Sequence, residues 1–418
     1  MTAATVGAVP LPASHPLRAK MLAVAAAFIG LAAGLPSSFG STSTAFIVPL
    51  TREFGWGRTI PSLMYTMSMV GTVIASIWLG RVIERFGAGT VAAVSGSCLL
   101  AVVLGLAAQS GSPAVALTLA FLAGLLGAGT GVGLYLSALP RWFDRDLGRA
   151  LGLAIIGQSA GLTLMPTLAS VVMATHGWRA AYAALAGAQI ALTLVAAAML
   201  LWLRRIARAH PRDAAREAAD GIDVAAALRG RTFWLLMTMI FLVTLGVFGG
   251  AIHLFPLYID RGIAPARLPL LAVALGVGTL VGRIGSGFLL DLFEAKLIAF
   301  ATFAIGAIGI AALALSTDVQ HPASLYLPPL LVGAALGAES DILAYMVRRY
   351  FGLRHYSAIY NRALIGYYAG AVTGPLTLGW AFDHLREPRW AIAALSVSCV
   401  AAMAVSQALP STRRPDAG

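Results

Sequence analysis

A single charged side chain, Arg283, interrupts an apolar stretch of 23 residues between Arg267 and Asp291. If this stretch is a membrane helix, Arg283 lies eight residues before Asp291, about 12 Å from the helix end, and its side chain spans roughly half of that depth. A lone arginine at the centre of a membrane helix costs at least about 2.5–3.5 kcal/mol on insertion scales. Because a guanidinium binds a carboxylate through two hydrogen bonds, we interpret Arg283 as an anchor for an organic anion. The alternative is a permanent ion pair that ties two helices together.

Two carboxylic acids in a later apolar segment, Glu339 and Asp341, are candidates to pair with Arg283 or to bind protons. Glu339 precedes Arg348 by nine residues, which places it about 13–14 Å deep, similar to Arg283, whereas Asp341 is about 10 Å deep. Side chains two positions apart point to nearly opposite sides of a helix, so the two acids do not serve one site. We expect Glu339 to accept a proton or to act as counter-ion. Asp341 forms a stripe with Tyr345 and Arg348, and we expect it to couple protons or to join a structural or gating network.

Five further polar residues complete the candidate site. His253 lies seven residues before Asp260, about 10 Å from the end of its helix, and histidine titrates near neutral pH, so it is a candidate for proton coupling and substrate contact. Tyrosine and glutamine side chains can orient a carboxylate or its substituent. The expected cavity residues of these types are Tyr65, Tyr135, Gln158 and Tyr367. For His253 and for each of these four, the alternative is a polar contact between packed helices.

The composition places these residues in a membrane protein. Of the 418 residues, 59% are hydrophobic and 11% are charged, and the mean hydropathy is +0.83. A soluble chain averages about 25% charged residues, and a soluble domain of this size could not bury so much apolar surface. Cys98 and Cys399 lie far apart in apolar segments, so we expect neither a disulfide framework nor a metal site. The sequence contains no Walker loop and no residue pattern typical of a soluble enzyme, so we expect neither enzyme activity nor a cofactor.

Twelve apolar segments are long enough to cross a bilayer, which takes about 20 residues in a helix. They lie near 21–50, 59–80, 89–108, 114–140, 150–175, 180–203, 233–259, 268–290, 297–316, 324–347, 357–382 and 390–409. Such runs exclude the alternating pattern of a membrane β-barrel, and the first is longer than the roughly 7–15 apolar residues of a secretory signal. We therefore predict an all-α membrane protein with twelve transmembrane helices.

The basic residues predict the orientation. If both termini are cytoplasmic, the inner segments hold 21 lysines and arginines and the outer segments hold seven. Because cytoplasmic loops carry an excess of lysine and arginine, we predict a multi-pass protein of the inner or plasma membrane with both termini inside. The same distribution explains the net charge of +12, so we expect the lipid bilayer rather than nucleic acid as a partner, and a monomer.

The chain repeats itself at a nearly constant offset. The pattern G-T-[VL]-x6-G-x3-[ED] occurs at 71–84 and again 207 residues later, at 278–291. The pattern I-G-x2-A-G-x4-P occurs at 156–166 and again 209 residues later. We predict two pseudo-symmetric six-helix bundles, residues 1–203 and 232–418, joined by a cytoplasmic linker, 204–231. Parallel six-helix repeats are typical of secondary transporters, whose substrate site lies near the midplane between the halves.

Two sets of motifs carry a family resemblance. The loop GRVIERFG at 80–87 resembles the G-x-x-x-D-R-x-G signature of the major facilitator superfamily (MFS), with Glu84 in place of aspartate, and a decayed copy runs from Gly287 to Asp291. The resemblance implies the MFS fold and a gating role for Gly80, Glu84, Arg85 and Asp291. PLTREFGWGR at 49–58, PRWF at 140–143 and HLFPLYIDRG at 253–262 resemble the monocarboxylate transporters and the oxalate/formate antiporters. That group moves small organic anions, often with protons, through an arginine at the position of Arg283; Thr279 replaces the acid that many monocarboxylate transporters place four residues earlier.

We therefore predict a secondary active transporter of small, monocarboxylate-like organic anions that works by alternating access in symport with protons. One alternative is an anion exchanger of the oxalate/formate type. Another is a proton-driven exporter of amphiphilic drugs or siderophore-like compounds. A non-transporting nutrient sensor is the alternative from a different class.

Overall fold

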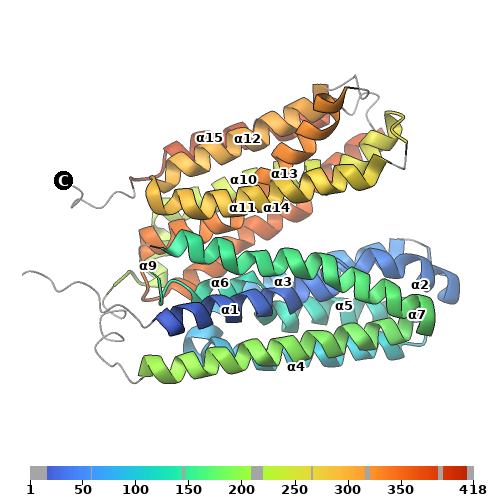
Figure 1. Ribbon diagram of the computed structural model, residues 1–418, viewed down its shortest axis with the longest axis horizontal. Helices are drawn as coiled ribbons and strands as arrows, with labels where there is room; N and C mark the ends of the chain where they lie inside the picture. The colour runs from blue at the N-terminus through green and yellow to red at the C-terminus, as the bar shows by residue number, and fades with distance from the viewer. Residues whose placement is uncertain are drawn as a thin grey trace, which may run out of the picture.

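The described part of the chain is helical and contains no β-strand. The computed structural model describes residues 17–57, 59–143, 146–208, 220–264, 267–315, 321–384 and 389–411. The helices form two bundles that lie side by side, one built from α1 to α7 and the other from α10 to α15 (Figure 1). This is the predicted all-α architecture of two six-helix bundles.

The N-terminal bundle contains two interrupted crossings and one long helix that is broken in the middle. Its elements are α1 (Leu17–Ala33), η1 (Pro36–Gly40), η2 (Ser43–Phe46), α2 (Ile47–Phe54), α3 (Thr59–Phe86), α4 (Ala88–Ala108), α5 (Pro113–Gly127), η3 (Ala128–Thr130), α6 (Val132–Ala138) and α7 (Leu147–Arg208). The first crossing changes to a π-helical turn at Pro36, which lacks the N–H that a regular helix needs. α7 is broken at Gly177, where φ is 81° and ψ is 173°. Glycine tolerates this conformation because it has no Cβ.

The C-terminal bundle consists of longer, mostly uninterrupted helices. The bundle is preceded by the short helix α9 (Val224–Arg229) and consists of α10 (Arg231–Asp260), α11 (Leu268–Leu292), α12 (Ala295–Leu315), α13 (Pro322–Phe351), α14 (Tyr356–His384) and α15 (Arg389–Gln407). The predicted linker contains the last turn of α7, the residues 209–219 that lie outside the described set, and α9. The domain boundaries therefore remain predictions.

The described helices account for twelve membrane crossings. Ten stretches are long and apolar enough to cross a membrane, and one of them, Leu147–Ala207, supplies two crossings because it is broken at Gly177. α14, with 29 residues, supplies the remaining crossing and carries the polar residues Asn361 and Arg362 in its first half. The prediction of twelve transmembrane helices is confirmed.

Glycines at matching positions of the repeat bring helices into contact in both bundles. A Cβ on Gly71 would lie 2.3 Å from the carbonyl oxygen of Phe121, and a Cβ on Gly278 would lie 2.1 Å from that of Leu330. α3 therefore touches α5 in one bundle as α11 touches α13 in the other. Small residues permit such close packing in membrane proteins.

The two bundles meet through polar contacts near one end of the molecule. We call this end, where α1 begins at Leu17 and α15 ends at Gln407, the inner end; α2 lies at the outer end (Figure 1). At the inner end Asn361 Nδ2 of α14 donates to the carbonyl oxygen of Gly133 in α6, at 2.9 Å. The charge distribution predicts that the inner end faces the cytoplasm.

Candidate substrate and coupling site

Arg283 lies in α11 where this helix meets α7 of the other bundle. Its side chain is buried, with an exposed fraction of 7%. The Nη1 atom donates to the carbonyl oxygen of Ile155, at 2.7 Å, and to Oγ of Ser159, at 2.8 Å. The Nε atom has no hydrogen-bond partner among the described residues. Arg283 therefore joins the two bundles through uncharged acceptors, and the ion pair considered above is absent from the described contacts.

The two candidate acids are both completely buried in α13. Oε2 of Glu339 accepts a hydrogen bond from Oγ1 of Thr244 in α10, at 3.0 Å, while Oε1 has no partner in the described chain. Oδ1 of Asp341 accepts a long contact of 3.4 Å from its neighbour Ser340, and Oδ2 is without a described partner. Both acids lie within electrostatic reach of Arg283, although neither forms a described ion pair with it. The site therefore groups one cation and two carboxyls that keep unused hydrogen-bonding capacity, and the expectation that the two acids do not serve one site is wrong.

The structure places His253 in a contact between two helices of one bundle. Its Nε2 donates to the carbonyl oxygen of Pro375 in α14, at 3.0 Å, and its ring stacks on Phe382 at a centroid distance of 5.5 Å. Along α10, His253 is nine residues from Thr244, or about 13 Å. The geometry favours the helix-contact alternative for His253, and its role in proton coupling remains a prediction.

One of the predicted cavity residues, Tyr367, lies within electrostatic reach of Arg283, and another, Gln158, is the chain neighbour of Ser159. Tyr367 of α14 is half-buried, packs edge-on against Phe248 at 5.7 Å, and lies within electrostatic reach of both Arg283 and Tyr65. Gln158 is half-buried in α7, beside the Ser159 that contacts Arg283. The predicted aromatic and amide residues therefore come from both bundles.

Tyr135 is completely buried in α6, with its ring against Gly30 of α1. A Cβ on Gly30 would lie 2.0 Å from Cζ of the Tyr135 ring, so only glycine leaves room for it. The Tyr135 hydroxyl has no hydrogen-bond partner among the described residues. Tyr135 therefore keeps an unused hydroxyl for a ligand or water.

The predicted gating residues form a pair of matching contacts at the inner end. Oδ1 and Oδ2 of Asp291 accept the backbone N–H groups of Gly148, at 2.8 Å, and Arg149, at 3.0 Å, in the first turn of α7. Oε1 of Glu84 accepts the backbone N–H of Ala358, at 2.9 Å, in the first turn of α14. Each carboxylate thus caps a helix of the opposite bundle, where the helix dipole favours negative charge.

The other two motif residues differ in their surroundings. A Cβ on Gly80 would lie 2.2 Å from the carbonyl oxygen of Ser357, so Gly80 permits close contact between α3 and α14. Arg85 is exposed, and its guanidinium lies over the ring of Phe86 at 5.2 Å. Arg85 is therefore not part of the contact between the bundles shown here.

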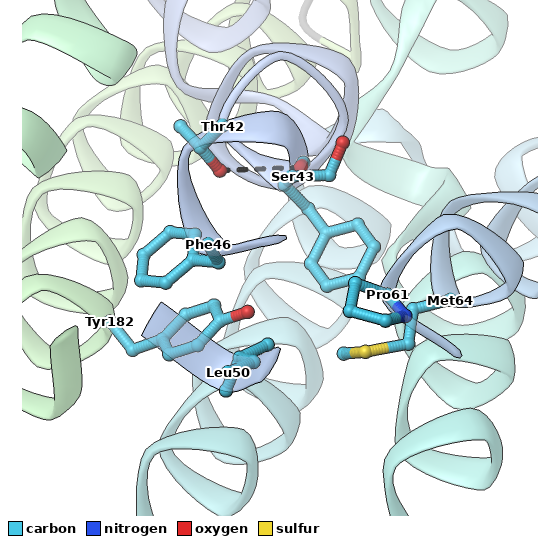
Figure 2. Close-up of a pocket in the computed structure, with 8 residues that line it drawn as sticks. Thr42, Ser43, Phe46, Leu50, Pro61, Met64 and Tyr182 are labelled. Carbon is cyan, nitrogen blue, oxygen red and sulfur yellow. Dashed lines mark hydrogen bonds between the residues drawn. The ribbon is translucent and has the colours of Figure 1, made fainter. Parts of the chain in front are cut away.

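Figure 2 shows a small pocket in the N-terminal bundle, lined by Phe39, Thr42, Ser43, Phe46, Leu50, Pro61, Met64 and Tyr182. Its lining is mainly apolar, and the rings of Phe46 and Tyr182 stack at 3.7 Å. Oγ1 of Thr42 donates to the carbonyl oxygens of Ser38 and Phe39 in its own segment. None of the predicted site residues lines this pocket, so it is separate from the Arg283 cluster.

Several polar residues that contact the predicted site, its gate or the opposite bundle were not identified from the sequence. Ser159, Thr244 and His355 contact Arg283, Glu339 and Glu84 respectively, and Asn361 joins the two bundles through Gly133. Thr244 and Asn361 are polar residues in membrane helices, which is a usable signal. Ser159 is one of many small polar residues in these helices, and the sequence does not distinguish it.

Comparisons with known proteins agree with this fold. A family model described as the Major Facilitator Superfamily matches residues 22–375. YcxA, an uncharacterized MFS-type transporter of Bacillus subtilis, is 26% identical over 62% of this chain and 63% of its own length. Human monocarboxylate transporter 11 is 31% identical over 37% of this chain and 32% of its own length. The chain therefore matches less than two thirds of each of these relatives.

A solved structure resembles the whole molecule. The MFS proton:xylose symporter XylE, bound to 6-bromo-6-deoxy-D-glucose, superposes with a TM-score of 0.73 over 96% of this chain and 98% of its own, at 13% identity. At this identity the likeness shows the fold alone. The match over residues 22–375 establishes that the chain belongs to the Major Facilitator Superfamily, and its long apolar helices make it a multi-pass membrane protein.

Proposed function

We propose that the chain transports small, monocarboxylate-like organic anions by alternating access, in symport with protons. The observation on which this rests is the buried guanidinium of Arg283 at the contact between the bundles. A buried arginine is costly in a membrane unless it meets water, a partner or a ligand, and its planar fork suits a carboxylate. The likeness to human monocarboxylate transporter 11 supports the same class of substrate.

The two buried acids support coupling to protons. Glu339 and Asp341 are inside the membrane-spanning part of α13 and near the cation that would bind the substrate. An anion that enters this site neutralises the charge of Arg283 and leaves the carboxylates without a compensating cation. Proton uptake by one of the acids would then restore the charge balance. Substrate and proton would therefore bind together, which is the requirement for symport.

Transport into proteoliposomes tests the proposal. With labelled lactate and an inward proton gradient, Arg283→Gln should reduce uptake at least about tenfold, because a hydrogen bond to a charged group contributes about 1.5–3 kcal/mol. Arg283→Lys should retain part of the uptake, since it keeps the charge but loses the fork. Arg267→Gln is the matched control, because Arg267 is exposed at the start of the same helix. Uptake by Arg283→Gln at the level of this control would refute the anchor.

The same vesicles separate the coupling residues from the anchor. Glu339→Gln or Asp341→Asn should abolish accumulation driven by the proton gradient while leaving exchange of internal for external anion. If both variants still accumulate lactate in response to the gradient, neither acid couples protons. If every variant and the unmodified protein transport no monocarboxylate at all, the substrate class is wrong.

A further inference from the structure

We infer that Ser159 is a positioning residue that holds Arg283 against α7 in the empty carrier, and that an anionic substrate releases this contact by replacing its acceptors. The inference rests on the proposed anion anchor and deepens it. The groups that the substrate must displace from Arg283 are the Ser159 hydroxyl and the Ile155 carbonyl. These two groups belong to the N-terminal bundle, whereas Arg283 belongs to the C-terminal bundle. Binding and the relative movement of the bundles would then be linked at one nitrogen atom, Nη1 of Arg283.

The contact has the geometry of a latch between the two bundles. Ile155 and Ser159 are four residues apart in α7, so they lie on one face of that helix. Their acceptor atoms are 2.7 Å and 2.8 Å from the same Nη1, which comes from α11 in the other bundle. Both distances are those of good hydrogen bonds. The empty carrier therefore satisfies part of the buried guanidinium with α7 itself.

The latch lies at the end of a tight seam between α7 and α11. A Cβ on Gly148 would lie 2.3 Å from the carbonyl oxygen of Gly287, and a Cβ on Gly152 would lie 2.9 Å from that of Arg283. Arg283 is one helical turn beyond Gly287 on the side away from the inner end. Its hydrogen bonds therefore extend the contact between α7 and α11 by one helical turn, away from the inner end.

Packing on the other side limits where the Arg283 side chain can go. A Cβ on Gly337 of α13 would lie 3.1 Å from Cγ of Arg283, so the stem of the side chain passes close to the α13 backbone. With its stem held there, the guanidinium exchanges partners mainly by moving its tip. The Nε atom is buried and has no hydrogen-bond partner among the described residues, so the guanidinium keeps one donor that a carboxylate would use.

A carboxylate competes well for this guanidinium. Opposite charges attract strongly inside a membrane protein, and a carboxylate can bind two guanidinium nitrogens at once. The hydroxyl of Ser159 and the carbonyl of Ile155 are neutral and each offers a single acceptor atom, whereas a carboxylate adds the attraction of its opposite charge and binds through two oxygens, so Ser159 and Ile155 are the weaker partners. An organic anion at Arg283 would therefore remove a contact between the bundles and favour their separation along the seam.

The test compares Ser159→Ala with Ser159→Thr and Thr163→Ala. The first removes the hydroxyl, and the second keeps it. The third removes an exposed hydroxyl one turn further along α7, whose described hydrogen bond is to the Ser159 carbonyl at 3.2 Å. The first measurement is hydrogen exchange of backbone amides at 147–155 in the ligand-free protein. Ser159→Ala should exchange about fivefold faster than the unmodified protein, the factor of one ordinary hydrogen bond, whereas the two controls should match it.

The second measurement is lactate binding at fixed pH. Ser159→Ala should bind lactate about fivefold more tightly, because the anion no longer has to displace the hydroxyl, and lactate should speed exchange at 147–155 in the unmodified protein. Unchanged hydrogen exchange in Ser159→Ala would overturn the positioning role of Ser159. Faster exchange with weaker lactate binding would overturn the statement that lactate displaces the Ser159 hydroxyl. The exchange measurement needs no ligand, so it decides the positioning role even if no monocarboxylate binds and the proposed function fails.

Discussion

The two carboxylates that cap helices across the bundle contact, Asp291 and Glu84, occupy equivalent positions of the repeat but make different bonds. Asp291 uses both oxygens on consecutive backbone N–H groups of α7. Glu84 uses one oxygen on the N–H of Ala358, while the other faces Nδ1 of His355 at 3.2 Å. We call these two contacts the Asp291 corner and the Glu84 corner. The Asp291 corner is made mainly with backbone, and Nε of Arg149 lies 4.0 Å from Oδ2 of Asp291, whereas the Glu84 corner includes the ring of a histidine.

His355 extends the Glu84 corner to the segment before α9. Its Nε2 lies 3.5 Å from Oδ1 of Asp223, which also pairs with Arg354 at 3.5 Å. The carbonyl of Asp220 accepts the N–H of Leu353 at 2.7 Å. The start of α14 is therefore fastened to both the N-terminal bundle and the segment that enters the C-terminal bundle. Two equivalent positions of the repeat therefore hold the helix starts that they cap through different sets of partners.

The largest expected effect comes from removing the Asp291 cap. Asp291→Ala leaves two N–H groups at the start of α7 without their acceptor and removes a charge that the helix dipole favours. We expect the closed inner end to lose about 2 kcal/mol, or about 30-fold in hydrogen-exchange protection at 147–152. Protection in the first turn of α14, 356–361, should fall less.

Asp146→Ala is the matched control for this experiment. Asp146 is an exposed acid near the same helix start, and it pairs with Arg149 at 3.3 Å. Exposed pairs of this kind contribute about 0–1 kcal/mol, so its effect should be small. Equal losses in the two variants, or equal losses at the two helix starts, would show that Asp291 has no special part in closing the inner end.

A smaller effect, with the opposite distribution, is expected from His355. Both ring nitrogens face carboxylates, Glu84 on one side and Asp223 on the other. His355→Ala removes both contacts and should weaken the Glu84 corner. We expect protection at 356–361 to fall by about 0.5 kcal/mol, since these groups are partly exposed, while protection at 147–152 should not change.

His176→Ala is the matched control and should leave both segments unchanged, because His176 is an exposed histidine whose described side-chain hydrogen bond is to Thr175, outside the inner contacts. Unchanged protection at 356–361 in His355→Ala, or a larger loss at 147–152, would contradict the proposed role of the two carboxylates.

The twelve helices could be predicted because crossing a bilayer requires long apolar runs, and the repeat could be predicted from motifs at a constant offset. The burial of Arg283, Glu339 and Asp341 followed from their positions within such runs. The hydrogen-bond partners of these three residues could not be predicted from the sequence. The contact of Arg283 with Ser159, for example, depends on how closely glycines allow α7 and α11 to approach. His355 was not predicted either. It lies just before α14, and its significance appears only once Glu84 and Asp223 are brought to it from distant parts of the chain.

The smallest effect should come from Arg85, the neighbour of Glu84 in the same motif. The resemblance implies a gating role, but Arg85 is exposed and lies over Phe86, with no described bond to the other bundle. Arg85→Gln should therefore change protection at 356–361 by no more than about 0.3 kcal/mol, well below the effect of Asp291→Ala at 147–152. A tenfold loss of protection would show that Arg85 joins the Glu84 corner in another state of the transport cycle. The two corners would then be more alike than the structure shows, because each would combine a carboxylate cap with a neighbouring charged side chain.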